Sequence, residues 1–171
     1  AGVPCTVIPG ITSAIGGLAA GGVPVTHRGI ATSFTVVTGH EDPTKPEAQV
    51  QWQSLAQSAE TLVVLMGVER LEAIAAAIIA GGREPSTPAA LVQEATTPRQ
   101  RTVTGTLETI AEIARSNAIT NPALFVVGAV AGLQPFLAPT RLSPLAGKRV
   151  LVTRTRSQAS SLVTALRLQG A

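Results

Sequence analysis

The chain has 171 residues, of which 45% are hydrophobic and only 2% aromatic, so its core must consist almost entirely of aliphatic side chains. This composition is typical of Val- and Ile-rich strands covered by Ala-rich helices, and it disfavours a protein that stacks nucleic-acid bases on aromatic rings. The net charge is +3, from 13 Lys and Arg against 10 Asp and Glu. The local excess of Arg and Lys between residues 141 and 167 could meet an anion, but a solvated edge is the favoured interpretation.

The cysteine and histidine content indicates the cellular compartment and whether a metal is bound. The single Cys5 cannot form an internal disulfide, which favours a cytoplasmic protein. The two histidines, His27 and His40, form no cluster with metal-ligand spacing, so we expect no metal. We find neither a membrane-spanning apolar run nor a signal peptide. Because the chain starts without Met and stops soon after a helical pattern, we expect it to be a segment of a longer protein.

The first elements in chain order are a strand over residues 3–8, a Pro-Gly turn, and a helix of small residues over 13–20 that ends at Gly21. Small residues allow close approach of the backbone, and the hydroxyls of Thr12 and Ser13 stand where the helix begins. Such hydroxyls either cap free N–H groups or leave those groups directed at a ligand. The segment is therefore either a tightly packed capped helix or one wall of a ligand site.

The central part of the chain alternates strands and helices. Apolar runs predict strands at 34–39, 61–67, 89–95, 101–105 and 122–128, and helical spacing predicts helices at 47–59, 71–79 and 107–114, the last capped by Thr106. Residues 40–47 are predicted as an exposed loop. The alternation predicts an α/β domain with a mostly parallel mixed sheet, flanking helices and one antiparallel pair near residues 90–105.

Ligands in such sheets collect at the carboxyl ends of strands, often where glycine permits close approach. The ends that fit are Thr38-Gly39-His40, Met66-Gly67, Ala95-Thr96-Thr97 and Val127-Gly128, although each glycine could equally serve a turn.

The C-terminal part begins with a lapse of regular pattern from residue 134, where prolines predict irregular structure, and we assign 139–147 as a linker. A strand over 149–153 and a helix capped by Ser157 follow. A strand and a helix alone cannot bury their apolar faces, so a second domain begins at residue 148.

Six segments, in order and at fitting spacing, resemble the tetrapyrrole methylases and, within them, the uroporphyrinogen-III C-methyltransferase family. The match covers about residues 1–138. The segments are VIPGITSA at 7–14, GVPVTHR at 22–28, VVTGH at 36–40, TLVVLMG at 61–67, ATTPRQR at 95–101 and PALFVVG at 122–128. The Thr-His-Arg and Thr-Thr-Pro-Arg-Gln-Arg parts point to this family over the cobalt-pathway methylases.

The resemblance implies two α/β domains with S-adenosylmethionine between them, a homodimer, and methylation of uroporphyrinogen III at C2 and C7. The product would be precorrin-2, which leads to sirohaem and cobalamin. Residues 1–27 would then be the end of the N-terminal methylase domain and residues 28–138 the C-terminal methylase domain.

The resemblance also assigns site residues. The cofactor contacts it implies are Thr12, Ser13, Met66, Ala95, Ala123 and Leu124, and the basic residues expected around the eight substrate carboxylates are His27, Arg28, Arg99 and Arg101. His27 could instead be a turn residue, His40 a strand-end cap or a substrate contact, and the arginines, Arg99 above all, ordinary surface residues. The family's G-x-G-P-G-D loop and its acid–base candidates lie upstream of this segment. We therefore expect no catalytic base in 1–171 and negligible methyl transfer by this segment alone.

The tail at 145–154, LAGKRVLVTR, with the Ser/Ala-rich helix after it, resembles the start of the uroporphyrinogen-III synthase family and predicts a fused methylase–synthase. Two other functions stay open. One is a methyltransferase of the same fold that acts on a later corrin intermediate, ribosomal RNA or a protein. The other, a non-enzymatic module that binds nucleic acid, is disfavoured because lysines are unclustered and aromatics are few.

Overall fold

The computed structural model describes residues 2–40, 50–138, 144, 145 and 147–170, except for the side chains at 156 and 157. The chain divides into two compact units, Ala1–Ala138 and Pro139–Ala171. Most of the predicted loop at 40–47, the start of the predicted helix at 47–59 and most of the predicted linker at 139–147 lie outside the described residues.

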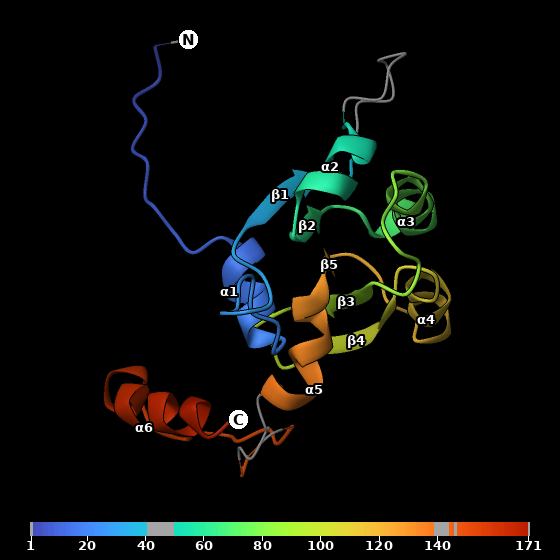
Figure 1. Cartoon of the computed structure of the whole chain (residues 1–171). Coiled ribbons are helices and arrows are strands. Elements are labelled where there is room, and N and C mark those ends of the chain that lie inside the picture. The colour runs from blue at the N-terminus through green and yellow to red at the C-terminus, as the bar shows by residue number, and fades with distance from the viewer. Residues whose placement is uncertain (1, 41–49, 139–143, 146, 171) are drawn as a thin grey trace. The chain divides into compact units, whose positions relative to one another are not determined.

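The first unit is built on a mixed five-stranded sheet of order β1-β2-β5-β3-β4 (Figure 1). Its strands are β1 (Phe34–Thr38), β2 (Thr61–Leu65), β3 (Pro88–Gln93), β4 (Arg101–Thr106) and β5 (Ala123–Val127). All five predicted strands of the central region are confirmed, and so is the α/β class with helices flanking a mixed sheet.

The direction of the strands differs from the prediction. Only β1 and β2 pair in parallel, and the other three pairs are antiparallel. The β3–β4 pair is the antiparallel pair expected near residues 90–105. The prediction of a mostly parallel sheet was wrong because a continuous apolar run indicates only that a strand is buried on both faces. A central antiparallel strand that is covered on both faces has the same apolar run.

Helices cover both faces of this sheet. Along β5, Phe125 and Val127 pack into one cluster, which α2 (Trp52–Ser58), α3 (Leu71–Ala80) and α4 (Ile110–Ser116) complete. Leu124 and Val126 pack into the other cluster, together with α1 (Ser13–Ala20) and the 3₁₀ helix η2 (Ala129–Leu133). The alternation follows from the two-residue period of a strand. Successive residues of β5 therefore contribute to opposite sides of the sheet, and each side has its own helical cover.

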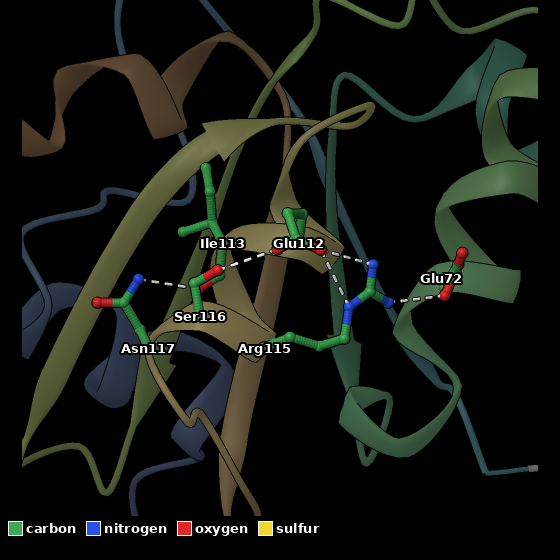
Figure 2. Close-up of polar contacts among 6 residues, drawn as sticks. All are labelled: Glu72, Glu112, Ile113, Arg115, Ser116 and Asn117. Carbon is green, nitrogen blue, oxygen red and sulfur yellow. Dashed lines mark hydrogen bonds and ion pairs between the residues drawn. The ribbon is translucent and has the colours of Figure 1, made fainter.

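Side-chain bonds connect α3 and α4 on the outer surface (Figure 2). The Arg115 guanidinium donates to Glu72 Oε2 at 2.8 Å and to Glu112 Oε2 at 2.9 Å, and the Ser116 hydroxyl donates to Glu112 Oε1 at 3.0 Å. These bonds lower the pKa of the Glu112 carboxyl, chiefly through Arg115. All these residues are exposed, so the network orients the helices more than it stabilises them.

Three local predictions in the first unit were wrong. Residues 2–12 contain no strand, since the β-rich run at 3–8 is exposed and has no neighbouring strand to pair with. Regular structure continues past residue 134 into α5 (Gln134–Leu137), because Pro135 occupies the first turn, where no N–H is needed. The residue at the N-cap position of α4 is Thr109, because Thr106 still belongs to β4; the Thr109 hydroxyl makes no capping bond and accepts from the Thr106 N–H at 2.9 Å.

The second unit contains α6 (Arg156–Leu168), whose N-cap is Thr155 and not Ser157. The predicted strand at 149–153 does not form, because the described part of this unit offers no strand as a partner. Instead Val150 and Val152 line a shallow pocket with Val163 of α6. Within the described residues, no helix has both the length and the apolar character needed to cross a membrane.

Candidate functional site

The three neighbouring strands β2, β5 and β3 have termini on the same side of the sheet, and we call the row of strand termini on this side the sheet edge. β5 runs antiparallel to both β2 and β3, with Gln93 of β3 opposite Ala123 of β5. The ends of β2 and β3 therefore lie beside the start of β5. This edge carries Met66 directly after β2, Ala95 two residues after β3, and Ala123 and Leu124 at the start of β5. Four of the predicted cofactor residues are thus on the same edge, although they are far apart in sequence.

The expectation that the Val127–Gly128 end also faces the ligand was wrong. Because β5 is reversed, this end lies at the opposite edge, where the Gly128 N–H donates to the Pro88 carbonyl at the start of β3, at 2.9 Å. The end of β1 does lie beside the end of β2. A Cβ atom on Gly39 would lie 2.7 Å from the Gly67 Cα atom, so glycine here lets two loops touch. Close approach of one loop to the other therefore accounts for these two glycines, neither of which has a positive φ angle.

Helix α1 crosses the sheet face beside this edge and contacts β2 and β5 (Figure 1). A Cβ atom at Gly17 would lie 2.5 Å from Leu124 Cδ1 and 3.2 Å from the Ala95 Cβ atom. Glycine therefore brings the α1 backbone into direct contact with two of the predicted cofactor residues. The sequence predicted that the small residues of this helix allow its backbone to approach another group closely. In the structure, the group that the α1 backbone approaches is the sheet.

The predicted hydroxyl pair lies at the start of α1. Thr12 is the N-cap residue, and its Oγ1 accepts from the Ala14 N–H at 3.3 Å. Both Thr12 and Ser13 are exposed, whereas Ala14 is buried against the sheet. The capping role is therefore confirmed for Thr12, and the exposed first turn leaves room for a ligand contact as well.

The backbone at the sheet edge adopts conformations that non-glycine residues rarely take. Met66, Glu94 and Thr96 have φ angles of 54°, 44° and 68°, in the left-handed region. The fourth such residue in the described part of the chain is Ala118, with φ 48°. Strain of this kind costs free energy and collects where a structure positions groups for function.

The turn between β3 and β4, residues 94–100, is closely tied to its surroundings. The Glu94 N–H donates to the Pro122 carbonyl at 3.0 Å, and the Arg99 Nε atom donates to Glu94 Oε2 at 2.6 Å. Gln100 accepts from the Thr96 N–H and donates to the Ala20 carbonyl, both at 2.7 Å. Arg99 is 80% exposed despite its ion pair. Sequence reasoning missed Gln100, although its segment, ATTPRQR, was one of the six recognised.

The predicted substrate residues are exposed and lie in two places. Arg101 pairs with Gln93 of β3, which pairs in turn with Ala123, so Arg101 lies at the same edge as the cofactor residues. Arg99 is in the turn that carries Ala95. Arg101 is at the start of β4 and donates to the Asn117 carbonyl at 2.5 Å. His27 and Arg28 lie in a turn before β1, where the His27 Nδ1 atom bonds the Arg28 carbonyl at 2.9 Å. The backbone of His27 also pairs with that of Ala31, so the turn interpretation of His27 fits the structure.

Gln93 and the end of β1 place further polar groups at this edge. Gln93 is buried; its Nε2 atom donates to Thr120 Oγ1 at 2.9 Å, and its Oε1 atom has no partner within the structure. The backbone N–H of His40 donates to Thr38 Oγ1 at 3.3 Å. The described part of the chain contains no group of three His, Cys, Asp or Glu residues placed to hold a metal ion. The edge can therefore offer backbone groups, hydroxyls and small apolar surfaces to a ligand.

The fold and this edge define an α/β domain with a mixed sheet, and comparisons with known proteins identify the family. The family model of the tetrapyrrole (corrin/porphyrin) methylases matches residues 1–111. This chain therefore belongs to the tetrapyrrole methylase family.

Two curated relatives are similar to most of this chain. A sirohaem synthase of Neisseria meningitidis serogroup C is 46% identical over 136 residues, which is 80% of this chain and 28% of that protein. A uroporphyrinogen-III C-methyltransferase of Bacillus subtilis is 38% identical over 170 residues, 99% of this chain and 35% of that protein. The chain thus spans about a third of these relatives.

A crystal structure of the uroporphyrin-III C-methyltransferase of Thermus thermophilus, complexed with S-adenosyl homocysteine, has the same fold. Its TM-score is 0.64 at 39% identity, over 77% of this chain and 56% of that one.

Proposed function

We propose that the protein is an S-adenosylmethionine-dependent methyltransferase that methylates uroporphyrinogen III at C2 and C7 to give precorrin-2. Family membership and the names of the relatives support the reaction class. The observation that carries the proposal is the convergence of Met66, Ala95 and the Ala123–Leu124 pair on one sheet edge beside α1. A structure of similar fold at 39% identity is a complex with the demethylated cofactor.

The residues at this edge fit such a cofactor. Ala95, half-buried, would offer a small apolar surface to a flat group, and Met66, 61% exposed with its backbone in the left-handed region, would present backbone groups to adenosine. The hydroxyls of Thr12 and Ser13 are exposed at the start of α1 and would meet polar atoms of the cofactor.

The chemistry that S-adenosylmethionine supplies is a methyl group on a sulfonium, which an electron-rich pyrrole carbon attacks in line. The task of the chain's residues is then to hold both reactants and to match their charges. Arg28, Arg101 and His27 would contact substrate carboxylates; all three are exposed, and a guanidinium suits bidentate bonds to a carboxylate. Positioning requires no protein nucleophile, and we assign no catalytic base to this chain.

The wider assignments are also proposals. We infer that the second unit begins a uroporphyrinogen-III synthase domain, so that one protein would make and methylate the same substrate. Support comes from the resemblance of residues 145–154 to the start of that family. The Bacillus subtilis match continues over 170 residues, so the second unit is shared with a relative that is itself named a C-methyltransferase. A homodimer in the cytoplasm, acting in sirohaem and cobalamin synthesis, is the assembly and place that we propose.

Binding of S-adenosylhomocysteine to the full-length gene product tests the pocket, with isothermal titration calorimetry as the measurement. We expect Met66→Asp to weaken binding at least tenfold, because it places a carboxylate and a disturbed left-handed turn beside the adenosine. Phe136→Asp makes the same kind of change on α5, where Phe136 is 83% exposed, and should leave the affinity unchanged. Wild-type affinity in Met66→Asp would contradict the placement of the pocket.

A further inference from the structure

One side chain connects two separate walls of the proposed pocket. The Gln100 Oε1 atom accepts from the Thr96 N–H, and the Gln100 Nε2 atom donates to the Ala20 carbonyl, both at 2.7 Å. Gln100 itself is half-buried in the turn before β4. A single side-chain amide thus joins the turn after β3 to α1. Gln100 and Ala20 are 80 residues apart in sequence.

Each end of this bridge is a group that regular structure leaves without a partner. Ala20 is the last residue of α1, and the last four carbonyls of a helix have no intrahelical donor. Thr96 has φ 68°, and it follows directly on Ala95, which packs beside Gly17 of the same helix. The bridge therefore holds a strained turn and a helix at one fixed separation.

We propose that Gln100 is a positioning residue for the cofactor pocket, acting through the separation between α1 and the Ala95–Thr96 turn. The inference rests on the proposed function, because it assigns a ligand to this pocket. The position needs a donor and an acceptor on one side chain of this length, which glutamine supplies. An ionised glutamate accepts only, and it would direct a carboxylate oxygen at the Ala20 carbonyl. Leucine supplies neither bond.

A second glutamine provides the matched control. The Gln134 Nε2 atom, on α5, donates to the Gly21 carbonyl at 3.3 Å, one residue beyond the bond that Gln100 makes. Its recorded bond reaches α1 and not the turn at 94–97. Gln134→Leu therefore removes a comparable bond to the same end of α1, so any general loosening of the helix will be seen in both variants.

The first measurement is amide hydrogen exchange in the full-length gene product, without cofactor. In Gln100→Leu we expect exchange of the Thr96 amide to accelerate about tenfold, while the amide of Val92 inside β3 keeps its protection. Gln134→Leu should leave the Thr96 amide protected. Unchanged Thr96 exchange in Gln100→Leu would overturn the proposal.

The second measurement is the affinity for S-adenosylhomocysteine between pH 4.5 and 7.5. Gln100→Leu should bind about tenfold more weakly throughout. Gln100→Glu should bind nearly as well as the wild type where the carboxylic acid is protonated, because the acid both donates and accepts. It should lose about tenfold as it ionises, whereas the wild type and Gln134→Leu should not show this loss.

The outcomes separate the two proposals. Wild-type affinity in Gln100→Leu, or a pH-independent affinity in Gln100→Glu, would overturn the role of Gln100 while the proposed function stands. If the unmodified protein binds no S-adenosylhomocysteine, the proposed function is contradicted and the role of Gln100 in a cofactor pocket with it.

Discussion

A single carboxylate oxygen, Glu60 Oε2, fixes the entry to β1. It accepts from the Thr32 N–H at 2.6 Å and hydroxyl at 2.8 Å, and from the Ser33 N–H at 2.8 Å and hydroxyl at 3.1 Å. Bonds to the ionised form favour that form, so they lower the pKa of the Glu60 carboxyl, with the Thr32 hydroxyl as the largest cause. This residue connects the loop before β1 to the start of β2.

The lowered pKa of Glu60 predicts a pH-dependent contribution to stability. Its pKa in the folded protein lies below the unfolded value of about 4.5, so the unfolded chain binds the proton more readily. The contribution is therefore complete above the unfolded pKa and is lost as the pH falls through the folded pKa. We expect Glu60→Gln to be less stable than the wild type at pH 7, with the difference shrinking toward pH 3.

Urea denaturation at a series of pH values measures this difference. Glu84→Gln, at a second exposed glutamate, is the matched control and should reproduce the wild-type pH dependence. A stability difference between Glu60→Gln and the wild type that stays constant from pH 7 to pH 3 would show that the carboxylate charge is not what matters.

At the scale of the element, the contact of α1 with the sheet depends on glycine. Gly17→Val should lower the free energy of unfolding by about 1–3 kcal/mol, because the added atoms collide with Leu124 and Ala95. Ala19→Val makes a similar change on the exposed side of α1 and should cost only the small loss of helix propensity, roughly 0.5 kcal/mol. Equal effects of the two substitutions, measured by urea denaturation, would contradict the packing described.

Strands and helices were largely predictable from the sequence, because burial imposes a local pattern. The run at 61–65 and the stripe at 71–80 carry that pattern within the segment itself. Strand direction was not predictable, since β5 reads the same whether it is parallel or antiparallel to β2. The exposed run at 3–8 has a β-rich composition but no neighbouring strand to pair with. Whether such a strand is present depends on the whole fold, so the local sequence could not show it.

The site shows the same division. Thr12 and Ser13 could be proposed because hydroxyls before a helix either cap it or meet a ligand, and Met66 because a strand end followed by glycine is a usual ligand position. Ala95 was indicated only by its place at a strand end, and Leu124 has no chemical signal of its own, so only the family resemblance pointed to it. Gln100 escaped because its role depends on a bond to Ala20, which lies 80 residues away in sequence.

At the scale of the whole molecule, the proposed pocket takes its parts from α1, β2, β3 and β5, so it exists only when the first unit is folded. The relatives are longer than this chain, which spans 28% and 35% of the two sequence relatives described. We therefore expect residues 1–171 alone to transfer methyl groups negligibly, while the full-length gene product should be active.

The most direct test of the proposed function is methyl transfer itself. The full-length gene product, incubated with S-adenosylmethionine and uroporphyrinogen III, should form a doubly methylated tetrapyrrole, seen as the absorbance of the oxidised product and as two methyl groups gained by mass. The product should not form when the cofactor is omitted. Failure to methylate uroporphyrinogen III, with another tetrapyrrole, an RNA or a protein methylated in its place, would contradict the assignment.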